Sequence, residues 1–234
     1  MIVAAVLTDR CAAFDAAGLQ LWRTGTDFRP RGAPWLTEAV RDYTALGGVL
    51  LRHIVALGAL VALLFLRLRR EAVLLALTIA GGWVVNSGLK ALFGRPRPEI
   101  VSHLTEAGGL SFPSGHSFNS AVVYIGIALA FAAISPRQSV RLTVIGIAVV
   151  LTLLVSLSRV WLGVHYPSDA IAGWLGGTGW AFLAAALLYR PAKAAAESEV
   201  AEVLDSISPL ADATTGRQGT SGSATLNRSR TRGS

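Results

Sequence analysis

The sequence has few of the residues that charge or cross-link a soluble domain. It contains one cysteine, Cys11, so no disulfide can form within the chain. Charged residues make up only 15% of the 234 positions, whereas soluble proteins average roughly 25%. No C-x-x-C or H-E-x-x-H pattern occurs, so the usual signals of a transition-metal site are missing. These shortages exclude an intrachain disulfide framework and point away from a soluble globular domain.

What the chain has instead is apolar length. Hydrophobic residues make up 53% of the sequence, and the mean hydropathy is +0.53. Runs near the roughly 17–25 residues that cross a bilayer recur along the chain. Because lipid offers no partners for free backbone groups, such runs must be helices. We therefore expect an all-α, polytopic transmembrane bundle with five spans, at about 47–66, 72–89, 117–134, 142–158 and 170–189.

The segments around these spans differ in composition. We expect residues 1–46 to be an N-terminal interfacial segment, 47–190 a transmembrane domain and 191–234 a cytoplasmic, largely disordered tail. Within the first segment, Phe14–Trp22 reads as a short amphipathic piece at the interface, and 25–36 reads as a loop. The net charge of +7 is explained by basic residues in membrane-flanking loops, so nucleic acid is not an expected partner.

The basic loops predict an orientation. Under the positive-inside rule they should be cytoplasmic, which places the opposite helix ends outside. Five spans with a cytoplasmic C-terminus put the N-terminus outside. The apolar fragment Met1–Leu7 resembles the end of an earlier span, so a first helix is expected upstream of this sequence. The residues that set this orientation are Arg67, Arg69, Arg70, Arg137, Arg141, Arg190 and Lys193.

Three polar clusters interrupt the apolar chain, each at the end of a hydrophobic run. They are Lys90-Ala-Leu-Phe-Gly-Arg-Pro-Arg97-Pro98, then Pro113-Ser114-Gly115-His116, then Ser158-Arg159 with His165 and Asp169. Lone basic residues at a membrane boundary usually only extend their charge toward water. Three cations beside two histidines and a carboxylate instead favour a site that holds phosphate, because phosphoryl transfer depends on positioning and charge stabilisation.

The second and third clusters supply proton-transfer and nucleophilic groups. Ser114 is suited to cap a helix, and Gly115 lets a phosphate approach the backbone N–H groups of its first turn. His116 has the pKa range of a general acid. Asp169 follows His165 by four positions, so on a helical turn it could hold one ring nitrogen and leave the other free to attack phosphorus.

The clusters K-x6-R-P, P-S-G-H and S-R-x5-H-x3-D resemble the signature of the type-2 phosphatidic acid phosphatase and vanadium haloperoxidase superfamily, and the apolar framework resembles its membrane branch. The resemblance implies a phosphohistidine on His165, oriented by Asp169, with His116 protonating the leaving oxygen. It also implies no metal and no cofactor, and six spans rather than five. The implied phosphate ligands are Lys90, Arg97, Ser114, Gly115 and Arg159.

The expected function is therefore hydrolysis of a lipid phosphate monoester or diphosphate in the cell membrane, with the site on the extracytoplasmic side. Candidate substrates by family resemblance are phosphatidic acid, phosphatidylglycerol phosphate and a polyprenyl diphosphate. Two alternatives stay open. One is a vanadate-dependent haloperoxidase using the same pocket, and the other is a non-catalytic lipid-binding or transport protein.

Several polar and aromatic residues near the clusters receive lesser roles. Four residues separate Arg95 from Lys90, rather than the six that separate Arg97 from it, so we expect Arg95 to be an auxiliary contact to phosphate or headgroup. Arg52 and His53 are expected to anchor a span at the interface, and Asn86 to make an interhelical hydrogen bond. The aromatic pair flanking His165, Trp161 and Tyr166, could face lipid.

Overall fold

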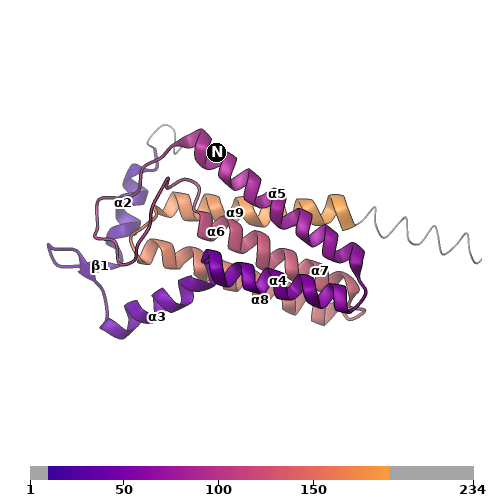
Figure 1. The fold of residues 1–234 in the computed structure, drawn as a ribbon. Helices are drawn as coiled ribbons and strands as arrows, with labels where there is room; N and C mark the ends of the chain where they lie inside the picture. The colour runs from indigo at the N-terminus through magenta and orange to yellow at the C-terminus, as the bar shows by residue number, and fades with distance from the viewer. Residues whose placement is uncertain (1–9, 190–234) are drawn as a thin grey trace, which may run out of the picture. The chain divides into compact units, whose positions relative to one another are not determined.

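The structure is a computed structural model that describes residues 10–189. Within this range the chain is mostly helical (Figure 1). It begins with α2 (Ala12–Gln20), a small antiparallel hairpin of β1 (Arg23–Thr24) and β2 (Arg29–Pro30), α3 (Pro34–Thr44), a 3-10 turn η1 (Ala45–Gly47) and α4 (Val49–Phe65). Then follow α5 (Arg69–Phe93), α6 (Gly115–Ser120), a π-helical turn η2 (Ala121–Ile125), α7 (Gly126–Ile134), α8 (Gln138–Trp161), α9 (Pro167–Ala184) and a second π-helical turn η3 (Ala185–Tyr189).

The expected number of spans fits this architecture. Four helices in the described range are long and apolar enough to cross a membrane. A fifth span results if α3 and α4, which meet at a 48° bend, cross together. Helices α5 and α8 extend beyond their apolar runs, so Lys90 lies in the last turn of α5 and Arg159 in the last turn of α8. The membrane-bundle prediction is therefore confirmed, with helix ends that carry the polar clusters.

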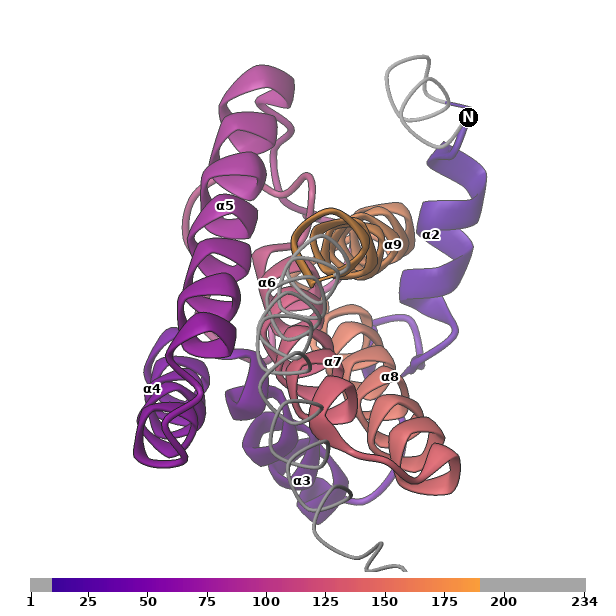
Figure 2. The same ribbon diagram turned by 90° about the vertical axis from the view of Figure 1, so that its right-hand side faces the viewer.

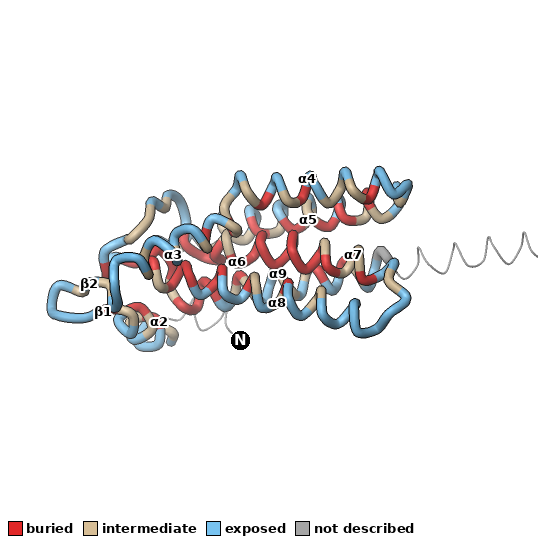
Figure 3. Tube along the Cα trace, turned by 90° about the horizontal axis from the view of Figure 1, so that it is seen from below, coloured by how far each residue is buried: buried red, intermediate tan, exposed pale blue. Residues whose placement is uncertain are grey.

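One span forms the centre of the bundle. In the helix from Gly115 to Ile134, 72% of the most apolar stretch is buried, against 22% to 28% in the other three spans. The end-on view shows α6 and α7 surrounded by α5, α8 and α9 (Figure 2). The burial-coloured trace shows the same helix as the most continuously buried one (Figure 3). The second polar cluster thus begins the innermost helix.

Glycines allow α9 to pack closely against α6. A Cβ atom on Gly173 would lie 2.7 Å from the Ser114 carbonyl oxygen, and one on Gly177 would lie 2.2 Å from that of Phe118. Small residues are the usual means by which membrane helices approach backbone to backbone. This contact holds the start of α6 next to the start of α9, so the second and third clusters meet.

The N-terminal segment differs in part from expectation. The amphipathic piece at Phe14–Trp22 largely coincides with α2, which packs on α9 through Gly18 and the buried Leu19. The predicted loop at 25–36 contains β2 and is shorter than expected, because α3 begins at Pro34. Proline is favoured at the first position of a helix. Fragment Met1–Leu7, the basic residues Arg190 and Lys193 and the tail from 191 lie outside the described residues.

Candidate active site

All three polar clusters lie at one end of the bundle. Lys90 is in the last turn of α5, Gly115 and His116 open α6, and His165 lies in the short turn between α8 and α9. The long connection 94–114 carries Arg97 and crosses the same end (Figure 1). The site is therefore built from helix ends that the packing of α5, α6, α8 and α9 brings together.

A pocket of about 320 Å³ opens at this end of the bundle. Of the predicted residues, Lys90, Arg97, Gly115, His116 and His165 line it. Its other lining residues, which were not predicted, are Val49, Arg52, Trp83, Asn86, Ser87, Gly108, Gly109, Leu110 and Asn119. The pocket thus combines cations, two imidazoles and amide groups, which suits an anion.

His165 is held so that one ring nitrogen faces the pocket cations. Its Nδ1 lies 3.5 Å from Asp169 Oδ2 and 3.3 Å from Ser111 Oγ, while its Nε2 lies 3.1 Å from Arg97 Nη1. A guanidinium can only donate, so Nε2 must be the acceptor and Nδ1 must carry the proton. Burial lowers the pKa of His165 to about 4, despite the opposing attraction of Asp169. At neutral pH the ring is therefore uncharged, with the Nε2 lone pair available.

Asp169 is fully buried behind His165 and saturated with hydrogen bonds. Its Oδ2 accepts from Ser111 Oγ and from the Tyr166 backbone N–H at 3.1 Å. Its Oδ1 accepts from Arg95 Nη1 at 2.6 Å. The predicted orienting contact between Asp169 and His165 is thus present in the structure. Ser111, which sequence reasoning missed, supports both side chains.

Arg95 differs from its predicted role. Its guanidinium binds Asp169 on one side and the buried Asp15 of α2 on the other, at 2.6 and 2.8 Å, and it stacks 4.1 Å from the Tyr166 ring. It is not among the residues that line the pocket. Arg95 is therefore a support for the carboxylate rather than an auxiliary contact to phosphate or headgroup. No local sequence pattern signals this contact, because Asp15 lies 80 positions away.

The loop cation Arg97 is fixed by backbone carbonyls. It donates to Val164 O at 2.7 Å, to Gly108 O at 2.8 Å and to Gly109 O at 3.1 Å. Lys90 Nζ donates to Leu110 O at 2.6 Å. Carbonyl oxygens carry no formal charge, so both cations keep their charge available to an anion in the pocket.

Three predicted residues lie beside the pocket rather than among its lining. Arg159 is buried, donates to Thr44 Oγ1 at 3.1 Å and has an Nε without a partner among the described residues. Ser114 is buried as the cap of α6, where its Oγ accepts from Ser117 N at 3.4 Å. Asp169 lies behind His165. Their contacts support the site, whereas direct phosphate binding by Ser114 and Arg159 stays a prediction.

Two other interpretations need revision. Asn86 is buried on the pocket wall, and its Oδ1 has no hydrogen-bond partner among the described residues, so the expected interhelical bond is not made by that atom. Arg52 is buried on the same wall rather than anchored at the interface. Asn86 precedes Lys90 by four positions on α5, which is the spacing that could have revealed it.

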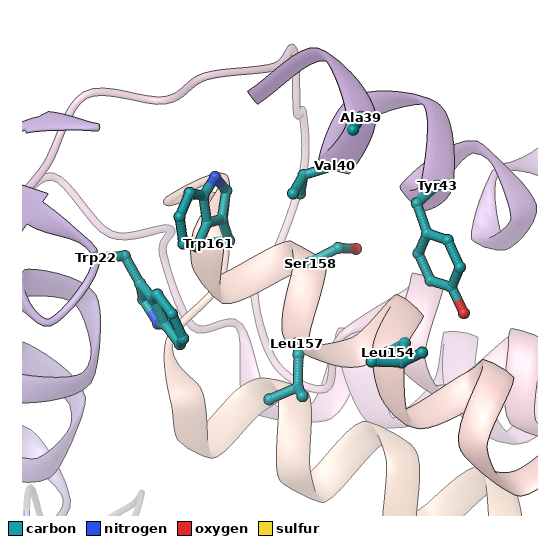
Figure 4. A pocket seen from close by; sticks show the side chains of 8 residues that line it. All are labelled: Trp22, Ala39, Val40, Tyr43, Leu154, Leu157, Ser158 and Trp161. Carbon is teal, nitrogen blue, oxygen red and sulfur yellow. The ribbon is translucent and has the colours of Figure 1, made fainter. Parts of the chain in front are cut away.

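A second pocket of about 290 Å³ lies between α3 and the end of α8 (Figure 4). Trp22 and Trp161 stack at one end of it with ring centroids 4.9 Å apart, and Tyr43 closes the other. Its lining contains no charged side chain, so it does not suit phosphate. Trp161 therefore lines an apolar groove, while its predicted companion Tyr166 stacks on Arg95.

Nothing in the described part of the chain resembles a metal centre. No group of three or more His, Cys, Asp or Glu side chains within residues 10–189 could hold an ion. The expectation of metal-independent chemistry stays a prediction.

Comparison with known proteins gives the site a family. The chain is 37% identical over 143 residues to phosphatidylglycerophosphatase B of Bacillus subtilis (strain 168), covering 60% of this chain and 69% of that protein. It is 32% identical over 126 residues to undecaprenyl-diphosphatase of Sulfolobus acidocaldarius, covering 52% of this chain and 57% of that protein.

A solved structure agrees with these relatives. The crystal structure of a transmembrane PAP2-type phosphatidylglycerolphosphate phosphatase from Bacillus subtilis superposes with a TM-score of 0.72 and 30% identity. The match covers 80% of this chain and 90% of the other. Residues 71–193, which contain all three polar clusters, match the family model of the PAP2 superfamily. The chain therefore belongs to the PAP2 superfamily.

Proposed function

We propose that this protein is a membrane-embedded, metal-independent phosphatase that hydrolyses a lipid phosphate monoester or diphosphate through a phosphohistidine on His165. One observation carries the proposal. The uncharged Nε2 of His165 lies beside Arg97 in a cation-lined pocket, while Asp169 and Ser111 hold its Nδ1. An oriented nucleophile beside bound cations is the arrangement that phosphoryl transfer requires.

The first step forms the phosphoenzyme. The Nε2 lone pair of His165 attacks phosphorus, and the bond from phosphorus to the leaving oxygen breaks. Lys90 and Arg97 balance the charge on the other phosphate oxygens, with Arg159 contributing from below the pocket. His116, which lines the same pocket, gives a proton to the leaving oxygen. Asp169 stabilises the Nδ1–H that becomes cationic as the bond to phosphorus forms.

The second step releases phosphate. Water attacks the phosphorus of the phosphohistidine, and the bond to Nε2 breaks. His116, now deprotonated, takes a proton from that water, as microscopic reversibility requires. The products are inorganic phosphate and the free imidazole of His165. No metal or further co-reactant is needed for this balance.

The substrate class follows from the position of the pocket and from the relatives. Val49 and Trp83 line the pocket and are 69% and 59% exposed on helices that would face lipid. An amphiphile could therefore place its phosphate inside while its tail stays in the bilayer. The named relatives act on phosphatidylglycerol phosphate and undecaprenyl diphosphate. We propose these two classes, with phosphatidic acid, as candidate substrates.

We place the site on the extracytoplasmic side of the cell membrane. Arg67 lies in the turn between α4 and α5, and Arg69 and Arg70 begin α5 directly after it. Arg137 lies in the turn between α7 and α8, and Arg141 follows in the first turn of α8. Both turns lie at the end of the bundle opposite the polar clusters (Figure 1). The positive-inside rule makes that end cytoplasmic and supports a site that opens outward.

The test is phosphate release by the purified protein in detergent with EDTA present, using the three lipid classes. We expect release from at least one lipid, reduced roughly 10³-fold or more in His165→Ala, because the nucleophile is removed. His53→Ala is the matched control, since His53 is exposed and its ring bonds only the Val49 carbonyl among the described residues. Residual activity of His165→Ala near that of the control would refute the assignment.

A further inference from the structure

Arg52 is a buried cation on a helix that otherwise holds almost only apolar residues. It lies in the first turn of α4 and is only 6% exposed. Its Nη1 donates to the Gly47 carbonyl oxygen at 2.8 Å, and its side chain lines the same pocket as Lys90 and Arg97. It is therefore a third arginine or lysine on that pocket wall, outside the three polar clusters.

The charge of Arg52 is not balanced by a carboxylate in the described structure. Among residues 10–189, the arginines that form ion pairs are Arg29 and Arg95. A buried, unpaired guanidinium is costly. The pocket that Arg52 lines also holds the cations Lys90 and Arg97 and no carboxylate. Arg52 is thus held in a position where only an anion entering the pocket would compensate it.

The contacts of Arg52 place it on the side of His116. Both residues meet at Gly47, since Arg52 binds the carbonyl of Gly47 and a Cβ atom on Gly47 would lie 3.1 Å from His116 Cδ2. Arg97, by contrast, lies 3.1 Å from the nucleophilic nitrogen of His165. If His116 protonates the leaving oxygen, Arg52 faces the leaving group rather than the phosphate under attack.

The pocket has room for a second anionic group. A phosphate presents four outer oxygens, and at roughly 30 Å³ for each water-sized group it takes less than half of a space this large. The pocket measures about 320 Å³. The same wall also presents the side chains of Asn86 and Asn119, which can donate to further phosphate oxygens.

We propose that Arg52 binds a second phosphate group carried by the leaving group, and so selects substrates with two phosphates. This rests on the proposed phosphatase function. In a lipid diphosphate the second group is the phosphate that departs with the lipid. In phosphatidylglycerol phosphate it is the phosphodiester. In the diphosphate reaction the electron pair of the broken bond moves onto that departing phosphate, where Arg52 balances it.

The experiment compares Arg52→Gln with the wild type on phosphatidic acid, phosphatidylglycerol phosphate and farnesyl diphosphate. We expect the ratio of kcat/KM for each two-phosphate substrate to kcat/KM for phosphatidic acid to fall by roughly 10–100-fold, the loss of one charge-assisted contact. The two kinds of two-phosphate substrate are distinguished by which kinetic constant changes. The diphosphate should lose kcat, because charge develops on its leaving group, whereas phosphatidylglycerol phosphate should mainly gain in KM. Arg41→Gln, which removes an exposed arginine bound to the Leu104 carbonyl, should leave both ratios unchanged.

Binding provides a readout that does not depend on turnover. Pyrophosphate should raise the melting temperature of the wild type more than orthophosphate does at equal concentration, and Arg52→Gln should remove this difference. Arg52→Lys should keep part of it, which also controls for folding. Equal losses on all three lipids, or an unchanged preference for pyrophosphate, would overturn the proposal. Failure of every lipid to react, with the pyrophosphate preference intact and sensitive to Arg52, would count against the phosphatase function alone.

Discussion

At the scale of single residues, the proposed mechanism makes the charge state of His165 decide when the site can react. The imidazole is shielded from water, and this burial lowers its pKa to about 4. The nucleophilic form is the neutral ring, which predominates above that pKa. The reaction should therefore remain available through mildly acidic pH and fail only when the ring is protonated.

This predicts the acid limb of the pH profile. With p-nitrophenyl phosphate, whose leaving group needs no protonation, kcat/KM should fall as pH decreases through about 4 rather than through the ordinary histidine value near 6.5. The measurement is initial rate against pH, with circular dichroism confirming that the fold persists at the acid end. An acid limb centred near pH 6.5 that arises from ionisation of the protein, and not of p-nitrophenyl phosphate, would contradict the buried environment of His165.

His116 gives a second prediction at this scale. His116→Ala should slow hydrolysis of a lipid with a poor leaving group by roughly 10²–10⁴-fold, the usual range for a general acid. The loss in phosphoenzyme formation should be much smaller with p-nitrophenyl phosphate, because its leaving oxygen needs no proton. Burst kinetics on the two substrates separate these rates. Equal losses in burst rate would remove the general-acid role.

Sequence reasoning worked for residues whose spacing carries the chemistry and failed where the contact is distant. The pairing of His165 with Asp169 follows from four-residue spacing, and the structure places the two side chains 3.5 Å apart. Arg52 and Arg95 look alike in sequence, as single basic residues near a helix end. Arg95 pairs with Asp15, 80 positions away, which only the fold brings to it. Arg52 binds the carbonyl of Gly47, only five positions away, but its burial depends on the packing of the folded helices.

At the scale of elements, α2 supports the carboxylate of Asp169. Asp15 accepts from Ser168 N and Ser168 Oγ at 2.9 and 2.7 Å, and from Arg95 at 2.8 Å. Arg95 in turn binds Asp169. The first helix of the described chain is thus connected to the site through a chain of charged hydrogen bonds.

Asp15→Asn tests this connection. It should lower stability by roughly 1–3 kcal/mol, because a buried charged acceptor is lost, and should lower kcat more than it changes KM, because Asp169 loses its support. Asp27→Asn is the control, since the Asp27–Arg29 pair is exposed and should matter by under about 1 kcal/mol. Thermal unfolding and steady-state kinetics provide both readouts. A variant with unchanged kcat would show that α2 is only a structural cover.

The contact between α9 and α6 depends on glycine at specific positions. Gly177→Ala should destabilise the bundle by roughly 1–3 kcal/mol, because the added Cβ would lie 2.2 Å from the Phe118 carbonyl oxygen. Gly179→Ala on the same helix meets nothing within 4 Å and should change stability by under about 1 kcal/mol. Melting temperatures of the two variants in one detergent decide this. Equal effects would indicate that helix propensity, not close packing, governs α9.

The length of the apolar runs predicted the long helices but not α3 or the bend that follows it. The Thr44–Gly47 corner is held by side chains from three other helices. Tyr124 donates to Leu46 O at 2.7 Å, Arg52 to Gly47 O, and Arg159 to Thr44 Oγ1. Tyr124 lies 78 positions from Leu46 and Arg159 lies 115 positions from Thr44, so no local pattern could reveal that α3 turns toward the site.

At the scale of the described molecule, the number of spans follows from hydropathy because lipid forces each long apolar run into a helix. The assembly of one site from three clusters follows as well, because antiparallel spans bring the end of α5, the start of α6 and the turn between α8 and α9 to the same end of the bundle. Which span is central is less evident from hydropathy. The helix from Gly115 to Ile134 is apolar like its neighbours, and its small residues and the facing glycines of α9 place it inside.

The central claim is that His165 carries the phosphoryl group. The most direct measurement is rapid quenching of His116→Ala with a radiolabelled p-nitrophenyl phosphate, followed by peptide mapping. This variant should form the phosphoenzyme and hydrolyse it slowly. Label that is stable to base, labile to acid and located on the peptide containing His165 is the predicted result. Continued turnover with no label on that peptide would contradict the account.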